Sequence, residues 1–277
     1  MSVFAQMLFF CATMALGVAV APAARAQQSA AAEVPSEDTW NSIKGDIFKG
    51  RAVLDGAGIV SLEAPRRAED AAVVPISMRI NLSESDERSV RSLTLVIDEN
   101  PAPVAGTFAL GPNAGVTSIS TRVRVNTYSY VRVVAELSDG RLYGVKAYVK
   151  ASGGCSAPVS TNPDAAKATL GQMKFRLFPS SDNSSPEAQL MLRHPQNSGF
   201  QMDQLTHLYI PPFFIETLKI WQGDDLLLTL DGGISISEDP NLRFNYRPNG
   251  AKKFNTEAVD TSKNVFRGEW PAEKSLL

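Results

Sequence analysis

The sequence predicts an all-β protein made of two immunoglobulin-like antiparallel β-sandwich domains and a short N-terminal helix. Three observations lead to this fold class. Short segments of alternating residue type recur along the chain, as in residues 121–125, where arginines alternate with valines. Gly, Asn and Pro separate these segments at turn positions. The segments are not separated by long helical patterns, so we expect antiparallel sheets.

The first 26 residues are predicted to be a secretory signal peptide. An apolar run from 3 to 20 precedes Pro22 and the residues Ala24-Arg25-Ala26, which fit an A-x-A cleavage site. We therefore expect a periplasmic protein. Cys11 lies inside the apolar run and leaves with the signal, so Cys155 is the only cysteine that we expect in the mature chain.

Composition excludes several classes of partner. The signal contributes one arginine and no acid, so the mature chain carries 26 Lys and Arg against 29 Asp and Glu, a net charge of −3. Such a balance indicates neither nucleic acid nor a membrane surface as a partner. No later apolar run approaches the ~20 residues of a spanning helix.

The first domain is predicted to span residues 27–150. Ser36-Glu37-Asp38 precede Trp40, Ile43 and Ile47 at helical spacing, which indicates a short amphipathic helix. About seven strands follow, and Ser138-Asp139-Gly140 is a hairpin signal between the last two. Charged residues that alternate along a strand usually lie on its solvated face, so we expect this of the arginines at 122, 124 and 132. The predicted strands are residues 58–62, 74–80, 92–97, 104–110, 119–125, 131–137 and 141–149.

The second domain is predicted to span residues 171–277, after an arm and linker at 151–170. Turn signals lie at 223–224, 231–233 and 249–250. The predicted strands are residues 174–178, 188–192, 206–210, 216–221, 226–230, 234–237, 242–246, 253–258 and 265–270.

The arm around Cys155 contains no side chain larger than a proline ring from Ala151 to Pro158. Gly153 and Gly154 precede the sulfur and leave the backbone poorly fixed. A lone cysteine is more often a small buried hydrophobe. These neighbours instead favour an exposed thiol on a flexible arm.

Catalytic and metal-binding options are few. The chain has two histidines, and neither has a second His or Cys close by, so we expect no metal and no cofactor. His194, before a proline, is expected to be a loop residue bonded to backbone, and His207 a surface or satisfied core residue. No G-x-S-x-G or phosphate-binding loop is present. Carboxylates that converge in space, as in a β-sandwich hydrolase, stay open as an alternative.

Cys155 is left as the residue with distinctive chemistry. It has no partner cysteine and no adjacent histidine base, which disfavours redox or protease chemistry within this chain. Its setting favours a sulfur that accepts a group covalently.

Residues Gly153-Gly154-Cys155 resemble the Gly-Gly-Cys-Gly-Gly motif of SoxY, the sulfur-carrier subunit of bacterial thiosulfate oxidation. Residues 193–199 and 236–244 resemble the His-Pro-x-x-x-Gly and Asn-Pro-x-x-x-Phe segments of its partner SoxZ. The combined order is similar to fused SoxYZ-like carriers associated with quinoprotein dehydrogenases. In SoxY the cysteine stands near a free C-terminus, whereas here Ser156-Ala157-Pro158 continue into a second domain.

The resemblance implies a non-enzymatic carrier. Cys155 would hold a sulfur or thiosulfate-derived group and present it to soluble periplasmic sulfur-oxidation enzymes, c-type cytochromes or a quinoprotein dehydrogenase. Gly153 and Gly154 would make the arm flexible and narrow. The alternative is a non-catalytic accessory module for such a dehydrogenase or cytochrome, with an incidental thiol.

Overall fold

The structure, a computed structural model, describes residues 36–83, 85–158, 168–178 and 185–272. The predicted signal peptide lies outside these residues and stays a prediction. Within the described part, strands dominate and one helix of ten residues is present. The prediction of an all-β fold with a short N-terminal helix is confirmed.

The first half of the chain contributes one helix and eight strands. The helix and strands, in chain order, are α1 (Asp38–Ile47), β1 (Val53–Asp55), β2 (Val60–Glu63), β3 (Val74–Ile80), β4 (Val90–Ile97), β5 (Val104–Leu110), β6 (Ser118–Val123), β7 (Ser129–Leu137) and β8 (Leu142–Val149). The second half contributes seven strands. They are β9 (Met173–Phe178), β10 (Glu187–Leu192), β11 (Ile215–Gln222), β12 (Asp225–Gly232), β13 (Asn241–Asn245), β14 (Lys253–Asp260) and β15 (Val265–Pro271).

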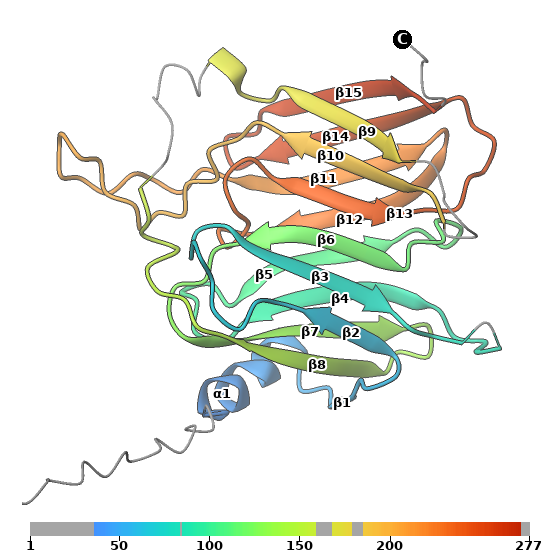
Figure 1. Cartoon of the computed structure of the whole chain (residues 1–277), viewed down its shortest axis with the longest axis horizontal. Coiled ribbons are helices and arrows are strands. Elements are labelled where there is room, and N and C mark those ends of the chain that lie inside the picture. The colour runs from blue at the N-terminus through green and yellow to red at the C-terminus, as the bar shows by residue number, and fades with distance from the viewer. Residues whose placement is uncertain (1–35, 84, 159–167, 179–184, 273–277) are drawn as a thin grey trace, which may run out of the picture. The chain divides into compact units, whose positions relative to one another are not determined.

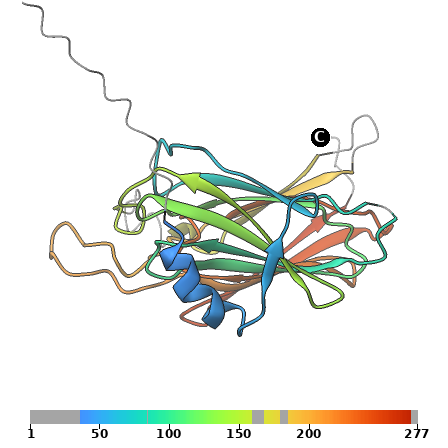
Figure 2. The ribbon, with the colours of Figure 1, turned by 90° about the horizontal axis from the view of Figure 1, so that it is seen from below.

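These strands form two sheets that face each other as two layers (Figures 1 and 2). The larger sheet has nine strands in the order β1-β8-β7-β4-β5-β12-β11-β14-β15, and the smaller has six in the order β2-β3-β6-β13-β10-β9. Alternate residues of each strand point into the space between the layers, as in β6 and β10, where every second residue is buried.

Both sheets continue from the first half of the chain into the second. In the larger sheet β5 pairs antiparallel with β12, and in the smaller sheet β6 pairs with β13. Gly111 lies at this junction, where only glycine fits. A Cβ at this position would stand 1.7 Å from the carbonyl oxygen of Leu226. Buried side chains of both halves, including Phe108 and Phe244, belong to the same hydrophobic core. The halves therefore share one interior, which fixes residues of the second half against the first.

Two predicted strands are absent from the described structure. Residues 206–210 follow a turn in which the Asp203 carboxylate accepts hydrogen bonds from the backbone N–H of Leu205 and of Thr206, and they contribute only a single bridge, between Tyr209 and Met202. Residues 234–237 contribute only a single bridge, between Ile236 and Val123 at the end of β6. The short strand β1, by contrast, was not predicted. It pairs in parallel with β8 at the sheet edge.

The expectation that the arginines lie on a solvated face is wrong for two of them. Arg124 is 1% exposed and Arg132 is 6% exposed. Arg132, on β7, is covered by α1, whose Trp40 ring lies 4.4 Å from its guanidinium carbon. Arg124 directly follows β6, where the second half of the chain covers it.

Candidate functional site

The segment that carries Cys155 follows β8 and is held by backbone hydrogen bonds. The Gly153 N–H donates to the Asn126 carbonyl (2.7 Å), and the Gly154 N–H donates to the Val125 carbonyl (3.1 Å). Gly153 adopts φ +78°, a left-handed conformation that glycine accepts without strain. Cys155 itself is 0% exposed. The expectation of an exposed thiol on a free arm is therefore wrong for this structure.

Gly154 is needed for close contact between backbones. A Cβ at this position would stand 2.1 Å from the Ala71 carbonyl oxygen and 2.6 Å from that of Val125. Both oxygens belong to the backbone and cannot move aside easily, so a larger residue at position 154 would push the segment away from residues 71 and 125. The two glycines that suggest flexibility in the sequence thus also allow tight packing of the arm.

Burial decides the protonation of the thiol. Removal from water raises the pKa of Cys155 to about 11, and the positive charge of Arg124 opposes this only in part. A thiol with this pKa is almost entirely protonated at neutral pH, and thiols react as thiolates. Burial therefore keeps the Cys155 thiol protonated at neutral pH, which lowers its reactivity.

Arg124 lies beside the thiol and bonds to both halves of the chain. Its Nη1 donates to the Gly154 carbonyl (3.2 Å) and its Nη2 to the Gln196 carbonyl (3.4 Å), while its Nε has no hydrogen-bond partner among the described residues. Burial lowers the pKa of Arg124, which Glu238 and Asp70 oppose electrostatically.

Asn100 fixes the turn that carries Arg124. Its Nδ2 donates to the Arg124 carbonyl (2.7 Å) and its Oδ1 accepts from the Asn126 N–H (2.8 Å). The same Nδ2 reaches the hydroxyl of Ser235 in the second half. The sequence gives no chemical signal for this position beyond the Asn-Pro pair that starts a turn.

Residues 194–201 of the second half cover the cysteine. The Ser198 hydroxyl donates to the Cys155 carbonyl, and the Gln201 side-chain oxygen accepts from the Ser198 N–H (2.9 Å). The segment that resembles SoxZ at residues 193–199 therefore lies directly on the cysteine that resembles that of SoxY. Sequence reasoning did not identify Arg124, Gln196 or Ser198 as site residues.

His194 has a structural role in this cover. Its Nδ1 accepts from the Gln196 N–H (3.2 Å), and its Nε2 lies 3.7 Å from the Asp260 carboxylate. The ring packs 4.5 Å from that of Phe213. Burial lowers the pKa of His194 to about 4, although Asp260 and Asp239 oppose the shift. The predicted backbone-bonded loop histidine is confirmed, and His207 lies exposed in a turn.

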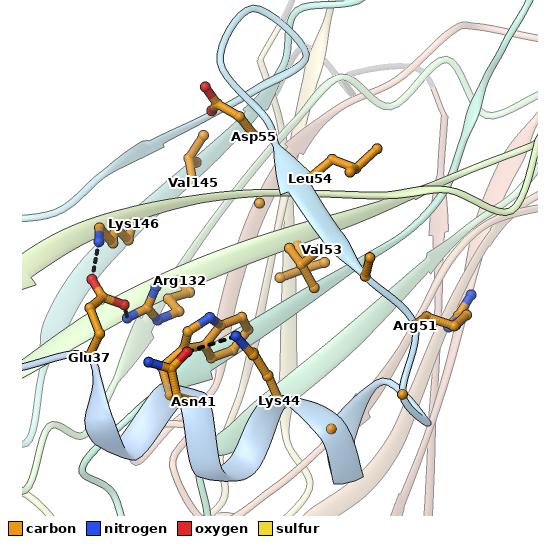
Figure 3. A pocket seen from close by; sticks show the side chains of 16 residues that line it. Glu37, Asn41, Lys44, Arg51, Val53, Leu54, Asp55, Arg132, Val145 and Lys146 are labelled. Atoms are coloured by element: carbon orange, nitrogen blue, oxygen red, sulfur yellow. Dashed lines mark hydrogen bonds and ion pairs between the residues drawn. The ribbon is translucent and has the colours of Figure 1, made fainter.

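A separate cleft of about 830 Å³ lies between α1, β1 and β8 (Figure 3). Several of its polar side chains bond to one another. Glu37 pairs with Arg132 (2.6 Å) and with Lys146, and Lys44 donates to Asn41 (2.7 Å). Lys146, which precedes the cysteine in the sequence, thus bonds to Glu37 at the start of α1. Cys155 does not line this cleft.

Metal binding and membrane spanning find no support in the described residues. No group of three or more His, Cys, Asp and Glu side chains there is placed to hold a metal ion. The described part also contains no helix whose length and apolar character suit a bilayer.

Two families match consecutive parts of the chain. The family described as "Sulfur oxidation protein SoxY" matches residues 44–155, and the family described as "Sulphur oxidation protein SoxZ" matches residues 178–271. Cys155 is the last residue of the SoxY match.

Solved structures that match parts of the chain include the sulfur carrier protein SoxY from Chlorobium limicola f thiosulfatophilum. It is 19% identical, with a TM-score of 0.35, over 41% of this chain and 92% of that one. Superoxide reductase (neelaredoxin) from Ignicoccus hospitalis, in its E23A form, is 13% identical, with a TM-score of 0.31, over 34% of this chain and 82% of that one. The comparison with curated proteins finds no match.

The two matches follow one another along a single chain, and the segments on which each resemblance rests meet at the buried cysteine. This protein therefore belongs to the SoxYZ-like sulfur-oxidation carrier proteins, with a SoxY region followed by a SoxZ region.

Proposed function

We propose that this protein is a non-enzymatic periplasmic carrier that holds a sulfur or thiosulfate-derived group covalently on Cys155. The observation that carries the proposal is the position of this thiol. It lies where the SoxY region ends, and Arg124 and Ser198 join it to both regions of the chain. The predicted signal peptide supports export to the periplasm.

The carrier works in two positions. In the closed position the thiol is buried and protonated, which protects it from side reactions. Loading requires that residues 151–158 leave the space under residues 194–201. The thiol then meets water and its pKa returns toward the ordinary ~8.5 of a cysteine. Because the segment is joined to the chain at both ends, it enters a partner as a loop.

Loading with thiosulfate is an oxidation. The thiolate sulfur forms a bond to the terminal sulfur of thiosulfate, so that Cys–S⁻ and S₂O₃²⁻ give Cys–S–S–SO₃⁻ and two electrons. A c-type cytochrome among the soluble sulfur-oxidation partners is the class of protein that takes these electrons. The carrier supplies the thiol and its presentation, and the partners supply the redox chemistry.

A second candidate function is favoured by the burial of the thiol. In this alternative the two regions form a non-catalytic accessory module for a quinoprotein dehydrogenase or c-type cytochrome, and Cys155 is an ordinary core residue. A small buried cysteine with a raised pKa fits this reading as well as it fits a closed carrier.

Intact mass of the protein purified from its native compartment separates the two functions. The carrier predicts an adduct on the peptide with Cys155 that reductant removes and whose mass matches sulfur or thiosulfate. Cys155→Ser should lose both the adduct and sulfur-compound oxidation. A bare thiol in every preparation, together with full function of Cys155→Ser, would favour the accessory module.

A further inference from the structure

The surroundings of Cys155 contain buried polar atoms that lack partners. Eight buried side-chain nitrogen or oxygen atoms of the described residues form no hydrogen bond, and seven of them belong to residues 121–124 and 194–201. Each of these two segments contacts the arm that carries the cysteine, because Arg124 donates to the Gly154 carbonyl and Ser198 to the Cys155 carbonyl. Buried polar groups are nearly always paired, so a cluster of unpaired ones indicates a place that accepts a further molecule or group.

Most of these unpaired atoms are N–H donors. They include the Nε of Arg124 and the amide nitrogens of Gln196 and Gln201, whose side chains are fully buried. The oxygens of both amides are already in use, because that of Gln196 accepts from the Ile215 N–H and that of Gln201 from the Ser198 N–H. The site therefore offers spare donors, which suit an acceptor with several oxygens.

Arg124 adds a buried positive charge to this set. Among the described residues its guanidinium bonds to the carbonyls of Gly154 and Gln196 and forms no ion pair, although Glu238 and Asp70 act on its charge electrostatically. Carbonyls carry no full negative charge, so a buried cation that is held mainly by them is costly. Its electrostatic interaction with Cys155 shows that this charge acts on the sulfur.

We propose that Arg124 is the counter-ion of a negatively charged, sulfonate-terminated group on Cys155, and that it makes the closed site selective for anionic conjugates over neutral ones. This inference rests on the proposed carrier function. Guanidinium is suited to this task because its planar fork binds oxyanions through two N–H groups at once. The segments at 151–158 and 194–201 separate for loading and close again over the charged conjugate.

The test compares two conjugates of similar chemistry and different charge. Unfolded protein is treated with tetrathionate, where the thiolate attacks a central sulfur, thiosulfate leaves and Cys–S–S–SO₃⁻ forms. A second sample is treated with methyl methanethiosulfonate, where methanesulfinate leaves and the neutral Cys–S–S–CH₃ forms. Each sample is refolded, checked by intact mass for one adduct, and heated to measure its Tm.

We expect the anionic conjugate of the wild-type protein to melt about 5 °C above the neutral one, as a charge-assisted hydrogen bond predicts for a domain of this size. Arg124→Met should lose this difference, and Arg124→Gln provides a second neutral variant if the first does not fold. Arg243→Met is the matched control, because the Arg243 guanidinium already pairs with the Glu187 carboxylate. It should keep the full difference.

An equal difference in the wild-type protein and in either neutral Arg124 variant would overturn the inference. The wild-type protein alone also provides a test. If its anionic conjugate melts no higher than its neutral conjugate, the inference is overturned. The carrier function is tested separately by treating the native protein with tetrathionate. Failure of the native thiol to react counts against the carrier, whereas reaction without any dependence on Arg124 counts only against the counter-ion.

Discussion

Two buried arginines of the SoxY region have opposite surroundings. The Arg132 Nε lies 2.9 Å from the Asp98 carboxylate, its Nη2 lies 2.6 Å from Glu37, and its guanidinium stacks on Trp40 and Tyr130. Arg124 has two carbonyl acceptors, no ion pair among the described residues and an unpaired Nε. Both side chains are almost fully buried, so the difference lies in their partners.

The comparison separates a structural charge from a functional one. Around Arg132 positive and negative groups balance, and the arrangement holds α1 against the larger sheet. Around Arg124 no described carboxylate forms an ion pair, although Glu238 and Asp70 act on its charge electrostatically, and the proposed cargo would bring an anion into contact with it. A buried charge without an ion pair is expected where function requires it.

The largest effect that we expect is on stability when Arg132 is removed. Arg132→Met should lower the free energy of unfolding by about 3–5 kcal/mol, because it leaves Asp98 buried without its cation. Arg124→Met should cost only about 1 kcal/mol, since it removes hydrogen bonds and also an unpaired charge. Urea denaturation of both variants measures the two losses in the free energy of unfolding. Equal losses would show that the two arginines do not differ in their structural role.

A double variant identifies the cause of the loss at Arg132. Burial raises the pKa of Asp98 even with Arg132 in contact. If the unpaired carboxylate accounts for the cost, Arg132→Met with Asp98→Asn should recover part of the stability that Arg132→Met alone loses. A double variant that is less stable than the single one would instead show that packing against Trp40 is what matters.

A smaller effect is expected from acid on the cover over Cys155. The pKa of His194 is about 4 in the folded protein and about 6.5 in the unfolded chain, so the unfolded chain takes up the proton first. The stability from neutral His194 is thus present above pH 6.5 and is lost as the pH falls toward 4. Between pH 7 and pH 5 the loss is roughly 2 kcal/mol.

His194→Asn is the matched variant, because its side-chain oxygen replaces the Nδ1 acceptor for the Gln196 N–H. Urea denaturation at pH 7 and pH 5 should show a flatter pH dependence for this variant than for the wild-type protein. Ser156→Ala, which leaves every titrating side chain in place, should keep the wild-type slope. Equal slopes for wild type and His194→Asn would mean that His194 does not titrate as a buried group.

Local sequence patterns predicted most of the secondary structure. Alternation within strands such as β6 and the spacing of Trp40, Ile43 and Ile47 in α1 depend on neighbours a few residues away, which the sequence shows directly. The joining of the two halves depends on β5 meeting β12, more than 100 residues later. No local pattern records that pairing.

The same limit explains the error at the cysteine. The small residues around Cys155 cannot bury its side chain by themselves, as the sequence indicates. The cover comes instead from residues 194–201, about 40 positions downstream, and from Arg124, about 30 upstream. Gly-Gly fits both a flexible arm and a tightly packed one, so the sequence singled out Cys155 but did not predict its burial.

The smallest effect that we expect is on how often the closed site opens. Ser198→Ala removes the hydrogen bond from the Ser198 hydroxyl to the Cys155 carbonyl, a bond worth about 1 kcal/mol, so alkylation of Cys155 by iodoacetamide should become about fivefold faster. Ser156→Ala is the control, because the Ser156 hydroxyl donates to Gly153 within the same segment and does not join the two regions. Its rate should stay within about twofold of wild type, the size of a few tenths of a kcal/mol. Equal acceleration by both variants would show that the segment opens by loosening internally, and that the SoxZ region does not hold it closed.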